Sequence, residues 1–146
     1  MQLTEAELKA RAAGIRLLIL DVDGVLTDGR IIYTDRGEEI KHFHVRDGHG
    51  VKLAERHGIT VVLITGRSSA AVAHRAANLG LRYLYQGVRD KLAVVTKLHQ
   101  DLGFSWAATA VVGDDLVDLP LLRRAGLAVA VADAVSEVKE QVHWIT

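Results

Sequence analysis

The sequence contains no cysteine, a single proline, few aromatic residues and no excess of either charge. Without cysteine, disulfides, thiol catalysis and zinc–thiolate sites are excluded. A formal net charge of zero, with no basic block, argues against a nucleic-acid partner. No apolar run approaches the ~20 residues that cross a bilayer, and the N-terminus lacks a signal-peptide pattern. We therefore expect a cytoplasmic protein with no membrane partner.

The remaining composition is that of an ordinary globular protein, with 49% hydrophobic and 25% charged residues. A chain of 146 residues is long enough to bury a core and has the usual size of one domain. The sequence shows neither a linker nor an internal repeat. We therefore predict a single domain over residues 1–146.

Strand and helix patterns alternate along most of the chain. Mainly aliphatic segments that end in turn residues predict buried strands over 17–20, 59–64, 82–85, 109–112 and 127–131. Helices are predicted over 4–13, 47–57, 69–79, 91–102, 116–125 and 134–141, with Thr4, Asp47 and either Ser68 or Ser69 as N-caps. This alternation predicts an α/β fold, a Rossmann-like doubly wound parallel sheet with helices on both faces.

Residues 29–45 interrupt the alternation. Two β-rich runs on either side of a turn containing Gly37 predict a protruding β-hairpin after the first strand. Its pattern leaves Ile31, Tyr33 and the neighbourhood of Ile40 and Phe43 without cover. The hairpin is therefore a candidate contact between subunits.

Polar residues stand where the predicted strands end. In a parallel sheet the carboxyl ends of the strands lie at one edge, so these side chains can converge there. They are Asp21 and Asp23 after the first strand, Thr65 after the second, Asp114 and Asp115 after the fourth, and Lys91 early in a helix. Each alone has a plain structural interpretation, as a turn, a helix cap or a solvated lysine. Their order and placement together favour a reactive centre.

These residue types suit phosphoryl transfer. A carboxylate such as Asp21 can attack phosphorus, and Asp23 can protonate the departing alcohol and later take a proton from water. Carboxylates at 21, 114 and 115 would repel one another by about 4 kcal/mol per pair at 4 Å and an effective dielectric of 20. Mg²⁺ relieves such repulsion. Thr65 can donate to a phosphoryl oxygen, and Lys91 adds positive charge beside it.

The stretch D-x-D-G-V-L-T-D at residues 21–28, followed in order by the Thr, Lys and acidic-pair positions, resembles the four motifs of the haloacid-dehalogenase-like (HAD) phosphatases. The resemblance implies that Asp21 is the nucleophile and Asp23 the general acid/base. It also implies magnesium ligands at Asp21, Asp114 and the backbone carbonyl of Asp23. We expect Asp115 and Asp118 to orient Lys91 or water near the metal.

Further motifs, F-x-V-R-D-G-x-G, T-G-R, L-Y-Q-G and G-D-D-L-x-D-L-P, resemble the capless 3-deoxy-D-manno-octulosonate 8-phosphate (KDO 8-phosphate) phosphatase family over residues 15–145. That family is tetrameric, cytoplasmic and Mg²⁺-dependent, and it acts in making the inner sugar of lipopolysaccharide. The resemblance therefore implies a homotetramer and a sugar-acid phosphate substrate, whose charged groups arginine matches bidentately. The implied substrate-binding residues are His44, Val45, Arg46, Asp47, Gly48, Lys52, Arg67, Arg75 and Lys91.

No cap domain fits between Asp28 and Thr65 or between Arg67 and Lys91. An open site would expose an acyl phosphate to water, so we expect neighbouring subunits to cover it. The family usually continues with a Gly-rich segment and a helix that reaches a neighbouring active site, whereas this sequence stops at Thr146. Residues 88–90 replace smaller polar residues, a change expected to alter the pocket rim.

Other interpretations stay open. A similar module accompanies sialic-acid cytidylyltransferases and acts on nine-carbon sugar phosphates. A phospho-acceptor signalling domain also uses Asp, Thr and Lys around Mg²⁺, and a non-catalytic assembly subunit is a third possibility. His42, His44 and His49 lie close in sequence, but without an evident fourth ligand a structural or interface role is preferred over a metal site.

Overall fold

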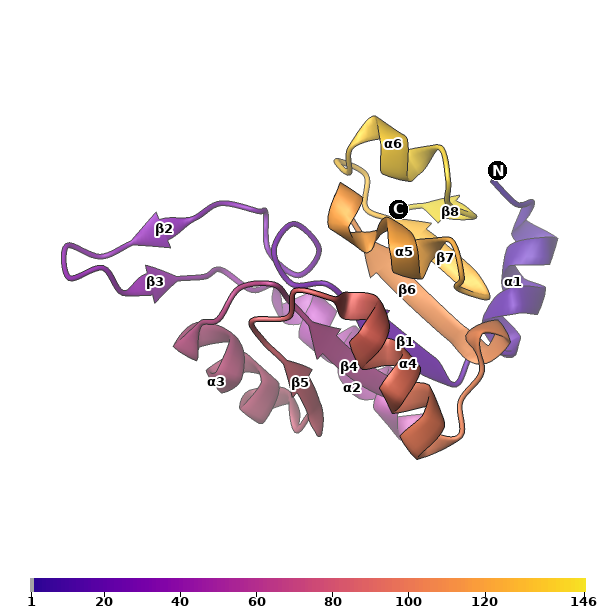
Figure 1. Cartoon of the computed structure of the whole chain (residues 1–146), viewed down its shortest axis with the longest axis horizontal. Helices are drawn as coiled ribbons and strands as arrows, with labels where there is room; N and C mark the ends of the chain where they lie inside the picture. Colours follow the sequence, from indigo (N-terminus) through magenta and orange to yellow (C-terminus); the bar gives the residue numbers. More distant parts are fainter. Residues whose placement is uncertain (1) are drawn as a thin grey trace.

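The computed structural model in Figure 1 describes residues 2–146. Six parallel strands form one sheet in the order β5-β4-β1-β6-β7-β8. They are β1 (Leu17–Leu20), β4 (Thr60–Ile64), β5 (Tyr83–Tyr85), β6 (Thr109–Gly113), β7 (Leu127–Ala130) and β8 (Trp144–Ile145). The predicted α/β, Rossmann-like class is confirmed.

Strand β1 lies in the centre of the sheet, and both of its faces are covered. Ile19 is in register with Val62 of β4 and Val111 of β6. Leu17 and Ile19 belong to the core on one side of the sheet, and Leu20 belongs to the core on the other. An uninterrupted aliphatic run is what a strand buried on both faces requires.

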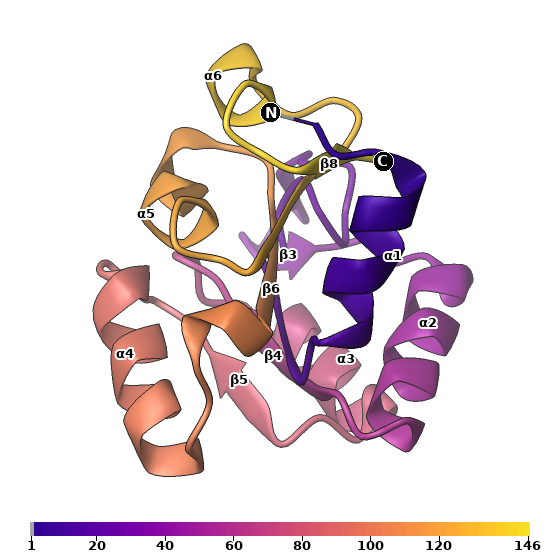
Figure 2. The ribbon, with the colours of Figure 1, turned by 90° about the vertical axis from the view of Figure 1, so that its right-hand side faces the viewer.

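Helices form a layer on each face of this sheet (Figure 2). One face carries α1 (Glu5–Ala13), α2 (Val45–Arg56) and α3 (Ala70–Leu79), and the other carries α4 (Lys91–Leu102), α5 (Leu119–Leu122) and α6 (Ser136–Lys139). Val51 of α2 and Val72 of α3 pack in the core that contains Leu20. Val95 of α4 and Leu122 of α5 pack in the core that contains Leu17 and Ile19. The two layers leave the carboxyl ends of the strands accessible between them.

Helix caps follow the predicted chemistry with one exception. Thr4 caps α1 in a capping box with Glu7, and Ser69 caps α3. The prediction that Asp47 caps the helix after the hairpin is wrong, because that helix, α2, begins earlier and has His44 as its N-cap. The Nδ1 atom of His44 accepts a hydrogen bond from the backbone N–H of Arg46 at 3.0 Å, so an imidazole takes the role expected of a carboxylate.

The C-terminal part of the chain differs from the prediction in two further places. The helix expected over 116–125 is a 3₁₀ turn, η2 (Leu116–Asp118), followed by the short α5. Pro120 has no N–H to donate to the carbonyl of Leu116, so a regular helix cannot start there. The helix expected over 134–141 is the shorter α6, and the chain then adds β8 beside β7, with Trp144 in register with Val129.

The predicted hairpin is present and projects away from the sheet (Figure 1). Its strands β2 (Ile32–Tyr33) and β3 (Glu39–Ile40) pair antiparallel. Ile31, Tyr33 and Ile40 are 54, 59 and 41% exposed, which agrees with the predicted lack of cover. The same prediction is wrong for Phe43, which packs against the core that contains Leu20 and Val51. Within residues 2–146 this hairpin is the insertion after β1, and those residues contain no cap domain. None of the helices in the described part of the chain is long and apolar enough to cross a membrane.

Candidate active site

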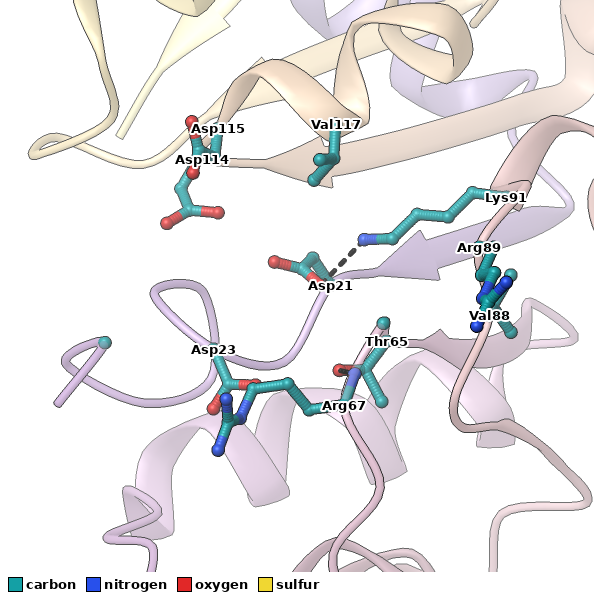
Figure 3. A pocket seen from close by; sticks show the side chains of 12 residues that line it. Asp21, Asp23, Thr65, Arg67, Val88, Arg89, Lys91, Asp114, Asp115 and Val117 are labelled. Atoms are coloured by element: carbon teal, nitrogen blue, oxygen red, sulfur yellow. Dashed lines mark hydrogen bonds and ion pairs between the residues drawn. The ribbon is translucent and has the colours of Figure 1, made fainter. Parts of the chain in front are cut away.

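The candidate site lies at the carboxyl ends of three neighbouring strands. From β1 the chain adds β4 and β5 on one side and then β6, β7 and β8 on the other, so the strand order reverses at β1. Such a reversal is where open α/β sheets bind ligands. A cavity of about 380 Å³ opens there (Figure 3). It is lined by Asp21, Asp23, Gly29, Thr65, Gly66, Arg67, Val88, Arg89, Lys91, Asp114, Asp115 and Val117.

Lys91 enters this site as the first residue of α4 and is only 7% exposed. Its Nζ donates to Asp21 Oδ1 and to Asp118 Oδ1, both at 2.8 Å. Burial acts to lower the pKa of Lys91, but the charges of Asp118 and Asp21 and the hydrogen bonds to them outweigh it, and the pKa is raised. Lys91 therefore stays charged and fixes one oxygen of Asp21.

Three carboxylates, that of Asp21 and two others, crowd together in this site. Oxygens of Asp21, Asp114 and Asp118 all lie within 4.8 Å of one another. Burial and the charge of Asp21 raise the pKa of Asp114 to about 7, and burial and the charge of Asp118 raise the pKa of Asp21. The single charge of Lys91 does not neutralise this cluster. A divalent cation would, and an all-oxygen donor set suits Mg²⁺.

Asp118 is committed elsewhere, which leaves Asp21 and Asp114 to hold a metal. One oxygen of Asp118 binds Lys91, and the other accepts the backbone N–H groups of Asp114 at 3.1 Å and Asp115 at 3.4 Å. In Figure 3 the carboxyl groups of Asp114 and Asp21 face each other across the cavity. The fully buried Asp118 therefore orients both Lys91 and the turn that presents Asp114.

Gly24 brings the backbone after Asp23 close to this carboxylate pair. Its φ is +87°, and a Cβ built there would lie 1.9 Å from Asp114 Oδ2. Thr27 Oγ1 accepts the N–H groups of Gly24 and Gly29, both at 3.2 Å, and so fixes the loop. The sequence requires glycine at this position both for the backbone conformation and for the space that Asp114 occupies.

Thr65 presents a hydroxyl to the cavity from the end of β4. It is 2% exposed, its N–H donates to the carbonyl of Tyr85 at 2.9 Å, and its own carbonyl accepts from Val88 at 3.1 Å. Its Oγ1 accepts the N–H of Arg67 at 3.3 Å, which leaves the hydroxyl hydrogen available to a ligand oxygen. The position suits a phosphoryl oxygen next to Asp21.

Two hairpin residues that sequence reasoning did not assign reach this site. Lys41 Nζ contacts Asp23 Oδ1 and lies 2.8 Å from Glu39 Oε1, with a side chain only 1% exposed. The same Glu39 oxygen lies 3.3 Å from Arg67 Nη2, and the hydrogen bond from Lys41 is the main cause of the lowered pKa of Glu39. The sequence does indicate that these two residues lie together, because side chains alternate between the faces of a strand and residues 39 and 41 share one face of the predicted strand.

The predicted substrate-binding residues fall into two groups. Arg67 and Lys91 line the cavity. The others lie on or against the N-terminal turns of α2 and are His44, Val45, Arg46, Asp47, Gly48, Lys52 and Arg75. Arg75 Nη2 donates to the carbonyl of His44 at 3.2 Å, and its guanidinium lies 5.6 Å from the centre of the Phe43 ring. This second group does not border the cavity of its own chain.

Asp115 and the histidines have separate roles in the structure. Asp115 lines the cavity, but its Oδ1 accepts the N–H of Leu116 at 2.7 Å as the cap of η2. Within residues 2–146, the one group of at least three potential metal-ligating side chains is the aspartate cluster, so His42, His44 and His49 are not part of such a group.

Comparison with known proteins places these features in a family. Residues 83–146 match the sequence model of the haloacid dehalogenase-like hydrolase family. The KDO 8-phosphate phosphatase KdsC of Escherichia coli is 50% identical over 129 residues, which cover 88% of this chain and 69% of KdsC. The crystal structure of the Yersinia pestis KDO 8-phosphate phosphatase has a TM-score of 0.94 and 44% identity, over 96% of this chain and 76% of that one.

A third relative was crystallised with ligands. The KDO 8-phosphate phosphatase of Moraxella catarrhalis, in complex with magnesium ion, phosphate ion and KDO, has a TM-score of 0.94 and 40% identity, over 98% of this chain and 82% of that one. Fold and site together define a phosphatase of the haloacid dehalogenase-like class, with a carboxylate cluster suited to Mg²⁺. Within that class, the chain belongs to the family of 3-deoxy-D-manno-octulosonate 8-phosphate phosphatases.

Proposed function

We propose that residues 1–146 form one Mg²⁺-dependent phosphatase domain that hydrolyses KDO 8-phosphate through an aspartyl-phosphate intermediate, in the cytoplasm, for the inner-core sugar of lipopolysaccharide. The observation that carries the proposal is the cavity at the strand ends. There Asp21, held by Lys91, shares one space with Thr65, Asp23 and Asp114. The family membership supports the substrate, because relatives of this chain bear that activity in their names.

The first step forms a bond between an Asp21 oxygen and phosphorus and breaks the bond from phosphorus to the sugar oxygen. Asp23 gives its proton to that departing oxygen. Lys91 and the hydroxyl of Thr65 hold oxygens of the transferring group, whose negative charge grows in the transition state. Asp21, Asp114 and the backbone carbonyl of Asp23 would hold Mg²⁺, which when bound would supply further positive charge at this site.

The second step releases phosphate. Asp23, now ionised, takes a proton from a water molecule whose oxygen attacks the phosphorus, and the bond to Asp21 breaks. Asp21 returns as a carboxylate and Asp23 is protonated again. Arg67 at the cavity rim offers a guanidinium to the sugar acid, whose carboxylate it matches in geometry.

A homotetramer supports this chemistry in two ways. The hairpin presents exposed Ile31, Tyr33 and Ile40 to a partner, and apolar cover excludes water from an open acyl-phosphate site. The basic and polar group around α2, including Arg46 and Arg75, lies outside its own cavity. We place it at the cavity of a neighbouring subunit, where it contacts the substrate.

A substrate panel tests the proposed activity. Eight- and nine-carbon sugar-acid phosphates are incubated with the protein and excess Mg²⁺, and released phosphate is measured. KDO 8-phosphate is expected to have the highest kcat/KM. Preference for a nine-carbon sugar phosphate would replace the substrate, stable labelling without turnover would favour a phospho-acceptor domain, and inactivity across the panel would favour a non-catalytic subunit.

Mixing inactive variants tests the shared site. Asp21→Asn removes the nucleophile, and Arg75→Ala removes a residue assigned to the neighbour's cavity. Subunits of the two variants, exchanged in one oligomer, are expected to regain part of the activity, because some cavities then contain both native residues. Asp21→Asn mixed with Lys91→Met is the matched control, since both residues lie in one cavity and no site is restored. Equal failure of both mixtures would place Arg75 outside the shared site.

A further inference from the structure

We propose that Lys41 is a positioning residue for Asp23. Lys41 restrains the Asp23 carboxylate so that it points at the oxygen of the departing alcohol. The proposal rests on the acid/base role of Asp23 given above. Lys41 lies on the segment after β3, 18 residues from Asp23 in the sequence, and it is not one of the residues that line the cavity. It therefore acts on the reaction through Asp23 and does not itself reach the reacting atoms.

The burial of Lys41 sets it apart from the rest of the hairpin. Its side chain is 1% exposed, whereas Ile31, Tyr33 and Ile40 of the same hairpin are largely exposed. Removing an ammonium group from water costs free energy, so such a group is buried only when carboxylates pair with it. Its two partners are Asp23 and Glu39, which are 22 and 11% exposed, so the three groups form one largely buried cluster where the hairpin meets the loop after β1.

The pairing restrains a side chain that the backbone alone leaves free to rotate. Asp23 stands in a loop just before Gly24, at the end of β1, and its carboxylate projects toward the side of the cavity where Arg67 lies (Figure 3). Asp21 has Lys91 to fix it, and Asp118 has Lys91 and two backbone N–H groups. Lys41 provides the corresponding restraint for Asp23.

The contact also connects the hairpin to a second residue that lines the cavity, Arg67. Glu39 joins Lys41 at 2.8 Å and Arg67 Nη2 at 3.3 Å, and Arg67 Nη2 lies 3.3 Å from the hydroxyl of Tyr33. A single chain of contacts thus runs from Asp23 through Lys41 and Glu39 to Arg67. Placing the hairpin places the acid/base and the rim arginine together.

Leaving-group dependence distinguishes positioning of an acid from general stabilisation. An alkyl phosphate such as KDO 8-phosphate needs a proton on its departing oxygen, whereas p-nitrophenyl phosphate releases a stable anion without one. The parameter kcat/KM covers the steps through departure of the alcohol, so it excludes hydrolysis of the phosphoenzyme. Lys41→Met is expected to lower kcat/KM by roughly 10- to 100-fold for KDO 8-phosphate and by less than about 3-fold for p-nitrophenyl phosphate.

Three further variants complete the test. Asp23→Asn is expected to show the same selectivity with a larger loss, roughly 100- to 10,000-fold on the alkyl substrate. Lys41→Arg keeps the charge and is expected to recover most of the loss. Lys97→Met removes a lysine from an exposed pair with Asp101 and is expected to leave both substrates unaffected. If Lys41→Met does not fold, as thermal unfolding would show, Lys41→Gln keeps a donor toward Asp23 and is expected to give a smaller loss with the same selectivity.

Each outcome has a defined meaning. Equal losses on both substrates, or no loss on either, would overturn the positioning role while the phosphatase assignment stands. If Asp23→Asn itself affects both substrates equally, its acid role fails and the positioning role fails with it. A wild-type protein that turns over neither phosphate would refute the proposed function itself.

Discussion

Replacing Asp114 with asparagine is expected to stabilise the metal-free protein and to remove the extra stability that Mg²⁺ confers. The carboxylate of Asp114 is half-buried beside that of Asp21, and burial and the charge of Asp21 raise its pKa from the ordinary 3.8 to about 7. The folded protein therefore binds this proton more tightly than the unfolded chain. Asparagine keeps the shape of the side chain and lacks the charge.

The sign and size of the effect follow from that pKa. Because the folded pKa is raised, the stability contributed by the protonated form is lost as the pH rises from about 4 to about 7. A pKa of about 7 in place of 3.8 corresponds to about 4 kcal/mol at most. Solvent screening of this partly exposed group reduces the figure to about 2 kcal/mol. For a chain of this length that is about 6 °C in melting temperature.

Thermal unfolding at pH 8, in EDTA and in excess Mg²⁺, measures both parts. In EDTA, Asp114→Asn is expected to melt about 6 °C above wild type, and the difference should vanish below about pH 4. Wild type should gain about 2.7 kcal/mol when Mg²⁺ is present at a hundredfold excess over its Kd, whereas the variant should gain little. Asp101→Asn, in an exposed pair with Lys97, is the control. A variant less stable than wild type in EDTA, or one equally stabilised by Mg²⁺, would refute this reasoning.

Two further predictions concern other parts of the chain. Gly24→Ala should abolish Mg²⁺-dependent stabilisation and activity, because the φ of Gly24 is +87° and the new Cβ would meet Asp114. The control is Gly37→Ala, with φ +80° and open space around it, which should show the backbone strain alone in the same melts. Equal loss of function in both variants would contradict the steric argument. His99 is buried and its Nε2 lies 2.9 Å from Thr109 Oγ1, whose hydroxyl donates to the carbonyl of Ser105, so Nε2 must carry a hydrogen and donate. Burial lowers the pKa of His99, so wild type should lose stability as the pH falls below about 6.5, and His99→Gln should lose less between pH 8 and pH 5 than the exposed-site control His74→Gln; identical pH dependence would rule this out.

The central part of the fold could be predicted because its signals are local and strong. The aliphatic run of β1 and the polar residues 21, 65 and 114 after successive strands needed only the rule that parallel strands end at one edge. Gly80 and Gly103, with φ of +69° and +72°, end their helices as expected. Boundaries were wrong where side chains compete with the usual rule, as at His44, which caps α2 in place of Asp47.

Contacts between distant segments were the part that the sequence could not supply. Lys41 looks like any strand lysine, and only the folded hairpin brings it to Asp23. Strand β8 is two residues long, too short to carry a period, and exists because β7 offers an open edge. Arg75 and the first turn of α2 were predicted as substrate contacts, yet they do not line the cavity that holds Asp21. Which side chains border a cavity depends on the folded positions of distant segments, and these are not encoded in a local pattern.

The measurement that tests the account most directly is detection of phosphate on Asp21 during turnover. The protein is mixed with KDO 8-phosphate and Mg²⁺, quenched in acid within milliseconds, digested and analysed by mass spectrometry. The account predicts one phosphoryl group on the peptide that contains Asp21 in the wild type, and none in Asp21→Asn, which should also be inactive. Rapid hydrolysis with no phosphorylated peptide, or normal turnover by Asp21→Asn, would contradict it.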